Sequence, residues 1–106
     1  MKHKYEIIYG TGLNKEFIKD INIDPILRII AQDLGGYSLN AQHRGYMMAN
    51  GQLAEETSQA ITILTNKPLD GLIDTYALAL KVMLNQESVL VVKTKIQGRL
   101  IWKTLR

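Results

Sequence analysis

Cysteine is absent from this 106-residue sequence, which excludes disulfide bonds, thiol nucleophiles and thiolate metal sites. Proline occurs twice and tryptophan once, and no apolar run approaches the ~20 residues that a membrane-spanning helix needs. The first residues, MKHKYEIIYG, contain neither the apolar region nor the small-residue cleavage site of a signal peptide. Together these absences predict a soluble protein of the cytoplasm.

The composition that is present is ordinary for a globular protein, with 46% hydrophobic and 22% charged residues, and the length suits a single domain over residues 1–106. The net charge of +3 is unevenly distributed. Residues 5–87 carry ten acids and six bases, a net of −4, whereas residues 1–4 and 88–106 carry seven bases and no acid. If the fold brings the two ends of the chain together, these bases form one basic patch.

A long hairpin occupies the middle of the chain. One strand is predicted over Tyr37–Ala49 and the next over about Gln52–Thr65. Asn50-Gly51 between them is a strong hairpin signal, because both central residues of a type I′ turn need positive φ. Gly45 interrupts the first strand and indicates a bulge or a close backbone approach. The polar outer half of the hairpin predicts a tip that projects beyond the core.

Two helical segments flank this hairpin. Asp24 is a suitable N-cap, Pro25 suits the first helical position, and Gly35-Gly36 marks the end of the first helix. The second helix is predicted over about Leu69–Asn85. Each helix has an apolar stripe at helical spacing. The first stripe contains Ile26, Leu27, Ile29, Ile30 and Leu34, and the second contains Leu69, Leu72, Ile73, Tyr76, Leu80, Met83 and Leu84.

The remaining strands lie near the ends of the chain. Lys4–Gly10 alternates aromatic and β-branched residues, and Gly10-Thr11-Gly12 is interpreted as a loop that ends this strand. Residues 14–23 have the spacing of a short helical turn. The strand Ser88–Ile96 has four consecutive apolar residues, Val89–Val92, after its first residue, which predicts burial on both faces near its start. A further short strand is predicted at Leu100–Trp102.

The order strand, helix, strand, strand, helix, strand predicts a ferredoxin-like βαββαβ fold of the α+β class with a C-terminal strand extension. Its antiparallel sheet carries both helices on one face, and its first and last main strands are expected to be central and adjacent. The other face of the sheet has no helix to cover it. We expect a homodimer that closes this face, lined by Tyr5, Tyr9, Tyr46 and Trp102, whereas Tyr37 and Tyr76 are expected in the core.

Several short motifs support this fold by resemblance. They are Gly35-Gly36-Tyr37-Ser38, Arg44-Gly45-Tyr46, Asn50-Gly51, Glu55-Glu56-Thr57-Ser58 and the run from Asn85 to Leu90. In this combination they resemble a group of small uncharacterised bacterial and phage proteins with a ferredoxin-like fold. The match covers about residues 35–92, and Tyr46 stands where that group often has tryptophan. The resemblance implies the fold and a mobile-element context, and it brings no established activity.

The candidate residues for chemistry near the hairpin are His43, Glu55, Glu56 and Ser58, which the predicted strands would pair. A register that sets His43 opposite Ser58 would allow a hydrolase-like pair, and the alternative is polar pairing across a solvated ribbon. No nucleophile elbow accompanies these residues. His3 and His43 lack metal-ligand spacing. We therefore assign no catalytic residue, no cofactor and no metal.

The surface offers two further features. Lys93, Lys95, Arg99 and Lys103 form a basic row near the C-terminus, suited to nucleic-acid phosphates or to an acidic protein, or simply to protecting a sheet edge. Met47 and Met48 near the hairpin tip suit adaptable contacts with a partner.

These features predict a non-enzymatic binding protein of phage or mobile-element type that inhibits a host protein or ribonucleoprotein. The specific hypothesis is an anti-CRISPR inhibitor acting on a Cas effector or its guide RNA. The alternatives are an RNA- or DNA-binding protein that uses the basic C-terminal strand, and a small enzyme or small-molecule sensor that uses His43 and Glu56. The predicted partner-binding residues are Arg44, Tyr46, Met47, Met48, Glu55, Glu56, Lys93, Lys95, Arg99 and Lys103.

Overall fold

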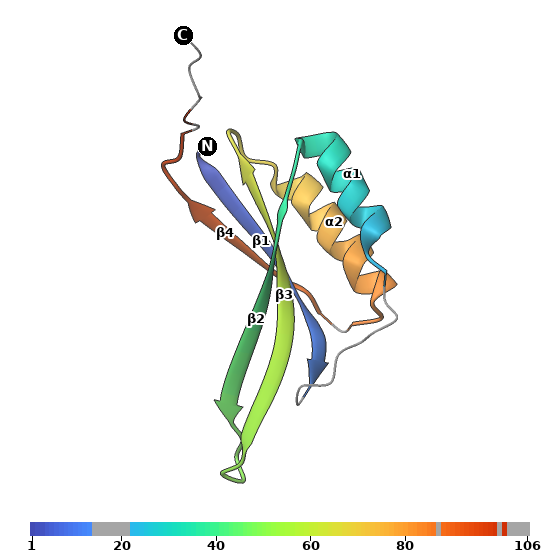
Figure 1. Ribbon diagram of the computed structural model, residues 1–106, viewed down its shortest axis with the longest axis vertical. Coiled ribbons are helices and arrows are strands. Elements are labelled where there is room, and N and C mark those ends of the chain that lie inside the picture. The colour runs from blue at the N-terminus through green and yellow to red at the C-terminus, as the bar shows by residue number, and fades with distance from the viewer. Residues whose placement is uncertain (14–21, 87, 100, 102–106) are drawn as a thin grey trace.

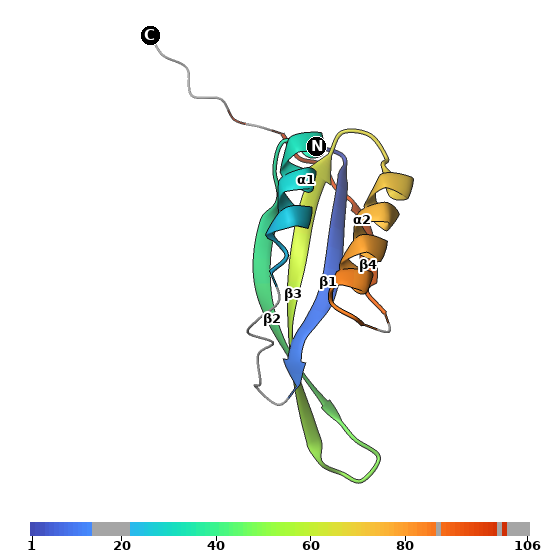
Figure 2. The ribbon, with the colours of Figure 1, turned by 90° about the vertical axis from the view of Figure 1, so that its right-hand side faces the viewer.

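The computed structural model describes residues 1–13, 22–86, 88–99 and 101, with the backbone alone described at residues 11–13, 42–46 and 54–57. Its elements, in chain order, are β1 (His3–Leu13), α1 (Asp24–Leu34), β2 (Ser38–Met47), β3 (Leu53–Thr65), α2 (Asp70–Met83) and β4 (Leu90–Lys95). The four strands form one antiparallel sheet in the order β2-β3-β1-β4. Both helices cover the same face of this sheet (Figures 1 and 2). The predicted ferredoxin-like α+β fold is confirmed.

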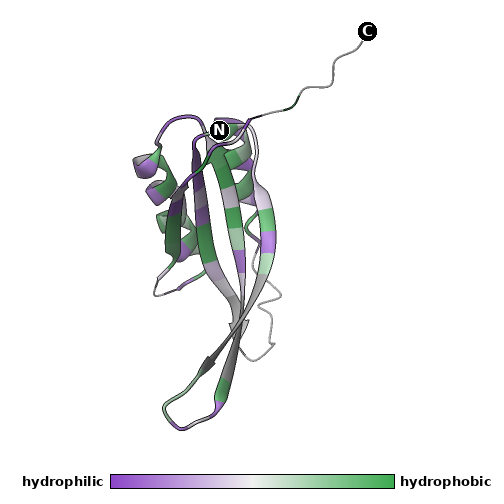
Figure 3. Cartoon of the chain, turned by 90° about the vertical axis from the view of Figure 1, so that its left-hand side faces the viewer, coloured by the Kyte–Doolittle hydropathy of each residue, from purple (hydrophilic) through white to green (hydrophobic). Residues whose placement is uncertain are grey.

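The register assigns each strand residue to a face. Ile7 of β1 pairs with Ile61 of β3 and Val91 of β4, and these residues share the face under the helices because successive residues point to opposite sides. Hydrophobic and hydrophilic positions follow one another along β2, whereas β4 is hydrophobic over its first residues (Figure 3). The helix-covered face and the two helices enclose the core, which contains Tyr5, Ile7, Tyr9, Ile26, Leu27, Ile30, Ile61, Ile63, Ile73, Tyr76, Ala77, Leu80 and Leu84.

The prediction that Tyr5 and Tyr9 line the uncovered face of the sheet is wrong. Both lie on the helix-covered face, with exposed fractions of 1% and 3%. The reason is the odd-numbered register of β1, which Ile7 shares. Tyr76 lies in the core as predicted, whereas Tyr37 is 39% exposed and does not. Homodimer formation stays a prediction, and its proposed aromatic lining is withdrawn for Tyr5 and Tyr9.

The boundaries of α1 differ from the prediction by one residue at its start. Ile23, not Asp24, is the N-cap, and the side chain of Asn22 accepts the backbone N–H of Asp24 at 2.9 Å. The predicted end is confirmed, since Gly35 adopts a left-handed conformation with φ of 86° and its N–H donates to Ala31 O at 2.9 Å. Ile29, placed in the apolar stripe, is 46% exposed.

The hairpin turn is not the predicted two-residue type I′ turn. Among described residues other than glycine, only Asn85 has a positive φ, so Asn50 does not meet the requirement of that turn. Instead, Gly51 N–H donates to Met48 O at 2.9 Å, and Met48 N–H donates to Gln52 O at 2.8 Å. These bonds close a three-residue loop with Gly51 in the left-handed region, the common alternative for hairpins.

The bulge lies in β1 and not at Gly45. The pairing of β2 with β3 runs without a shift from Ser38 opposite Thr62 to Met47 opposite Leu53. The pairing of β1 with β3 shifts between Gly10 and Gly12. These glycines therefore do not end the first strand as predicted, because the strand passes through a bulge and continues to Leu13.

Past the pair of Leu13 and Glu56, β2 and β3 pair only with each other among the described strands and form a projecting arm (Figure 1), as predicted. Met47 and Leu53 on this arm are 68% and 59% exposed. At the other side of the sheet, β4 neighbours β1 as predicted but forms an edge, so it is not central. Leu90 at its start is 50% exposed, and the predicted burial on both faces is wrong. Most of the helical turn predicted over residues 14–23 lies outside the described residues, because residues 14–21 are not described. Of the predicted strand Leu100–Trp102, only Ile101 is described.

Candidate functional site

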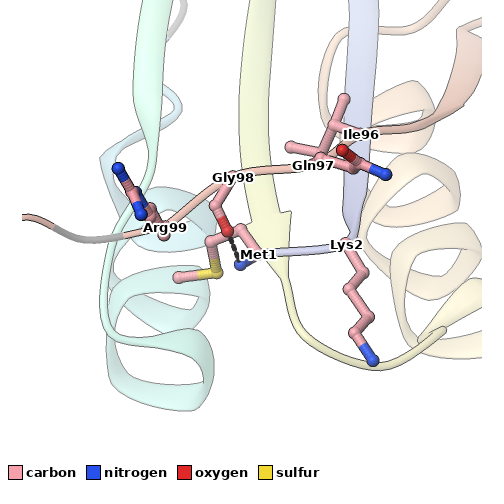
Figure 4. A pocket seen from close by; sticks show the side chains of 6 residues that line it. All are labelled: Met1, Lys2, Ile96, Gln97, Gly98 and Arg99. Carbon is pink, nitrogen blue, oxygen red and sulfur yellow. Dashed lines mark hydrogen bonds between the residues drawn. The ribbon is translucent and has the colours of Figure 1, made fainter.

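The two ends of the described chain meet beside the sheet, as predicted. Met1 O accepts the N–H of Gly98 at 2.8 Å, and Lys2 O accepts the N–H of Ile96 at 3.0 Å. A pocket of about 420 Å³ lies at this junction, lined by Met1, Lys2, Ile96, Gln97, Gly98 and Arg99 (Figure 4). Its size suits a small molecule. However, the side chains of Lys2 and Arg99 point away from each other, so they form no convergent anion site.

The predicted basic row is divided by the sheet. Lys93 and Lys95 lie on the helix-covered face, opposite Tyr5 and His3. Lys4 belongs to the uncovered face, where its Nζ lies 3.8 Å from Glu6 Oε1. Arg99 follows β4, and Lys103 lies outside the described residues. The structure therefore joins the ends of the chain without gathering their bases into one surface, and nucleic-acid binding stays a prediction.

Lys93 belongs to a polar cluster at the start of α2. Its Nζ lies 3.0 Å from Asp70 Oδ1 and 5.7 Å from the centroid of the Tyr5 ring. The Tyr5 hydroxyl donates to Asp70 Oδ1 at 2.5 Å and accepts the backbone N–H of Leu69 at 2.9 Å. The hydrogen bond from Tyr5, followed by that from Lys93, lowers the pKa of Asp70, and the bond to Asp70 raises the pKa of Lys93. Because each group already has a partner, the cluster anchors α2 to β1 and β4.

This cluster predicts a specific pH dependence of stability. The lowered pKa of Asp70 makes its pairing stabilising above the ordinary value of 3.8, and this contribution disappears as pH falls through the lowered pKa. The raised pKa of Lys93 makes its pairing stabilising below 10.5, and this contribution disappears as pH rises through the raised pKa. Lys93→Met should therefore lower the urea midpoint at neutral pH, and the difference from wild type should vanish at strongly acidic pH.

Lys95→Met is the matched control, because Lys95 lies two residues along the same face of β4 and has no ion pair with a described residue. It should leave the urea midpoint nearly unchanged at every pH. Equal effects of the two substitutions would show that the loss comes from net charge and not from the Asp70 pair.

A second group of polar residues surrounds the bulge of β1. Gly10 O accepts the side-chain N–H of Gln86 at 2.5 Å, which satisfies an edge carbonyl that lies beyond the last residue paired with β4. On the helix-covered face, the Tyr9 hydroxyl donates to Gln59 Oε1 at 2.6 Å, and burial raises the pKa of Tyr9 to about 12. On the uncovered face, Ser58 pairs with Gly10 and is 3% exposed. Hydrogen bonds therefore hold the strand next to the bulge at the edge and on the helix-covered face.

The predicted cross-strand pair of His43 and Ser58 does not form. In the observed register Ser58 lies opposite Gln42, and His43 lies opposite Thr57. A one-residue difference in register moves a side chain to the other face of the sheet. The hydrolase-like arrangement is therefore wrong. Arg44 lies opposite Glu56 and Gly45 opposite Glu55 in the same ladder.

The predicted partner-binding residues do not meet at one place. Residues 44–56 belong to the hairpin, and Met47 and Met48 are exposed there, whereas Lys93, Lys95 and Arg99 lie at the far end of the sheet. Within the described part of the chain, no three His, Asp or Glu side chains are placed to hold a metal ion. None of the described helices is long and apolar enough to span a membrane.

Comparison with known proteins shows the fold. No protein-family model and no curated protein matches the chain. Among solved structures, a phage SAM (S-adenosylmethionine) lyase in its apo state is similar, with a TM-score of 0.60 and 23% identity over 88% of this chain and 79% of the lyase. A phage SAM lyase in complex with S-methyl-5′-thioadenosine has a TM-score of 0.60 and 24% identity over 89% of this chain and 81% of the lyase.

These similarities contradict the prediction of a non-enzymatic anti-CRISPR inhibitor. Two solved structures that are similar to most of the chain are described as those of an enzyme, a phage SAM lyase. The prediction rested on small size, the absence of a catalytic motif, a projecting hairpin and a basic patch, and none of these features excludes an enzyme. The alternative of a small enzyme agrees better with the comparison. The chain therefore shares its fold with phage SAM lyases.

Proposed function

We propose that this protein is an enzyme that cleaves SAM and releases S-methyl-5′-thioadenosine, acting in the cytoplasm where SAM is found. The observation that carries the proposal is the likeness of fold to phage SAM lyase over 88–89% of the chain, including a lyase structure that contains S-methyl-5′-thioadenosine. Fold alone does not specify function, so the proposal also needs a site suited to this substrate.

The chemistry of SAM explains why a site without a recognisable nucleophile suffices. The sulfur of SAM is a sulfonium, and when the bond from sulfur to the aminobutyryl group breaks, the electron pair stays on sulfur and gives a neutral thioether. A lyase adds no water, so the four-carbon fragment either closes through its own carboxylate or loses a proton. The protein therefore needs to orient the substrate and stabilise its cationic groups more than to attack it.

A carboxylate is the group best suited to stabilise a sulfonium and an ammonium. Several described acids already have partners: Glu6 lies near Lys4, Asp33 accepts the hydroxyl of Tyr76 at 2.6 Å, and Asp70 binds Tyr5 and Lys93. Glu56 lies in β3 opposite Leu13, the last residue of the bulged strand β1, and Glu55 precedes it opposite Gly45 of β2. Because successive residues of a strand alternate between its faces, residue 56 belongs to the same face as Ser58, the uncovered face of the sheet. We place the substrate on this face, next to the bulge.

The decisive experiment incubates the purified chain with SAM and measures S-methyl-5′-thioadenosine by liquid chromatography and mass spectrometry. We expect product formation well above the uncatalysed background. S-adenosylhomocysteine, in which sulfur is a neutral thioether, should not be cleaved because its leaving group would be a thiolate. In heavy-oxygen water the freshly formed four-carbon product should contain no solvent oxygen. Failure to form S-methyl-5′-thioadenosine from SAM would contradict the proposal.

A further inference from the structure

The hydroxyl of Ser58 is buried and, within the described part of the chain, makes no hydrogen bond. Ser58 is 3% exposed, and its Oγ has no hydrogen-bond partner among the described side chains and backbone groups. A buried polar group in this state costs about 1–3 kcal/mol, and most proteins avoid it. Thr65 on the same strand shows the usual arrangement, since it is 6% exposed and its Oγ1 donates to Lys67 O at 2.7 Å. Among the described residues of β3, Ser58 is therefore the exception in having a buried hydroxyl without a hydrogen bond.

The surroundings of Ser58 suit an approaching ligand. Its cross-strand neighbour Gly10 has no side chain, and glycine within a strand often marks a close approach by another group. The ladder between β1 and β4 ends at Ile8 and Leu90, so no strand flanks Gly10 on its outer side. The side chain of Gln86 covers this edge by donating to Gly10 O, so a ligand would reach Ser58 over Gly10 from the uncovered face of the sheet. Because Ser58 is only 3% exposed, the side chains beside it would move aside as the ligand binds. The bulge that follows Gly10 is a feature found next to active sites.

The residues next to Ser58 and Gly10 on the uncovered face are apolar. Ala60 pairs with Ile8, and Ile8 pairs with Leu90, which is 50% exposed. A hydroxyl beside an apolar strip matches a nucleoside, which combines a flat apolar base with ribose hydroxyls. The positively charged part of SAM would then lie on the opposite side of Ser58, towards residue 56.

We propose that Ser58 Oγ hydrogen-bonds a ribose hydroxyl of the nucleoside, with the base lying along Ala60, Ile8 and Leu90. This inference rests on the proposed function, because SAM and its product S-methyl-5′-thioadenosine are the nucleosides concerned. In this arrangement the missing partner of Ser58 is supplied by the ligand. The free protein accepts a small loss of stability in return for a hydrogen-bonding group that is ready for the ligand.

The test combines stability and binding. Ser58→Ala removes a hydroxyl without a partner, so the melting temperature of the ligand-free protein should be unchanged or higher, by up to about 4 °C. The affinity for S-methyl-5′-thioadenosine, measured by isothermal titration calorimetry, should fall about tenfold, as expected for one lost hydrogen bond. Ser58→Cys, which keeps a weaker hydrogen-bonding group, should show an intermediate affinity.

Thr65→Val is the matched control, because it removes a buried hydroxyl that has a partner. It should lower the melting temperature and leave the affinity for S-methyl-5′-thioadenosine unchanged. If Ser58→Ala lowers the melting temperature and keeps wild-type affinity, the hydroxyl is structural and the inference is overturned. If the wild type cleaves SAM and Ser58→Ala does so with the same KM, the inference alone fails. If the wild type neither binds S-methyl-5′-thioadenosine nor cleaves SAM, the proposed function fails with it.

Discussion

Replacing Glu56 by glutamine is expected to lower kcat/KM for the cleavage of SAM by about 100-fold or more, the size of effect seen when a group that stabilises charge in the transition state is removed. Glutamine has nearly the same shape as glutamate but no charge. The substitution therefore removes the attraction to the sulfonium and ammonium groups while changing little else. Initial rates of S-methyl-5′-thioadenosine formation at several SAM concentrations measure the effect.

Glu55→Gln provides the control, because the two residues are adjacent in β3 and alternate between the two faces of the sheet. Both substitutions change the net charge by the same amount, in the same strand. We expect Glu55→Gln to change kcat/KM by no more than about twofold, since residue 55 belongs to the opposite face of the sheet from the proposed substrate site. Equal losses would show a general charge effect, and full activity of Glu56→Gln would show that the substrate does not bind next to Glu56.

Replacing Ile7 by alanine is expected to lower the free energy of unfolding by about 2–5 kcal/mol. Ile7 is fully buried in the central strand β1, and its partners Ile61 and Val91 lie on the helix-covered face on either side. Alanine would leave a cavity that rigid neighbouring strands cannot fill. A loss of this size is a large fraction of the stability of a small domain and should be clear from urea unfolding.

Ile8→Ala is the matched control for this substitution. It removes the same atoms from the next residue of the same strand, but Ile8 lies on the uncovered face and is only partly buried. We expect less than half of the loss caused by Ile7→Ala, because less apolar surface is returned to water. Equal losses would mean that the uncovered face is packed as tightly as the core, for example by a second copy of the chain.

The prediction of a non-enzymatic protein treated a missing motif as missing chemistry. Motifs such as a nucleophile elbow mark enzymes that must create a reactive group. SAM is already activated, because its sulfonium leaves as a neutral molecule, so a binding surface with a suitable charge can act on it. The residues at the bulge of β1 were missed for a related reason. Glycines often end a strand, so Gly10-Thr11-Gly12 predicts a loop, whereas β1 continues through these residues to Leu13.

The order and nature of the elements follow from local patterns in the chain. Alternation in Lys4–Gly10, helical spacing in α2 and the stop at Gly35 each depend on a few neighbouring residues, and each agrees with the structure. The hairpin turn also depends on the residues that flank Asn50-Gly51, and the structure has a three-residue loop in place of the predicted type I′ turn. Local patterns therefore sufficed for the fold class, because packing two helices on four strands leaves few arrangements.

The pairing between strands needed the tertiary structure. A shift of one residue separates His43 from Ser58, and the odd-numbered register of β1 places Tyr5 beneath the helices, within reach of Asp70. Neither fact has a local signal, because both faces of these strands contain apolar and polar residues. The position of Ser58 beside Gly10, with no described hydrogen-bond partner for its hydroxyl, likewise depends on the pairing of two strands that are distant in sequence. Composition and spacing determined the architecture, and the register between strands decided which side chains share a face and thus where a substrate can bind.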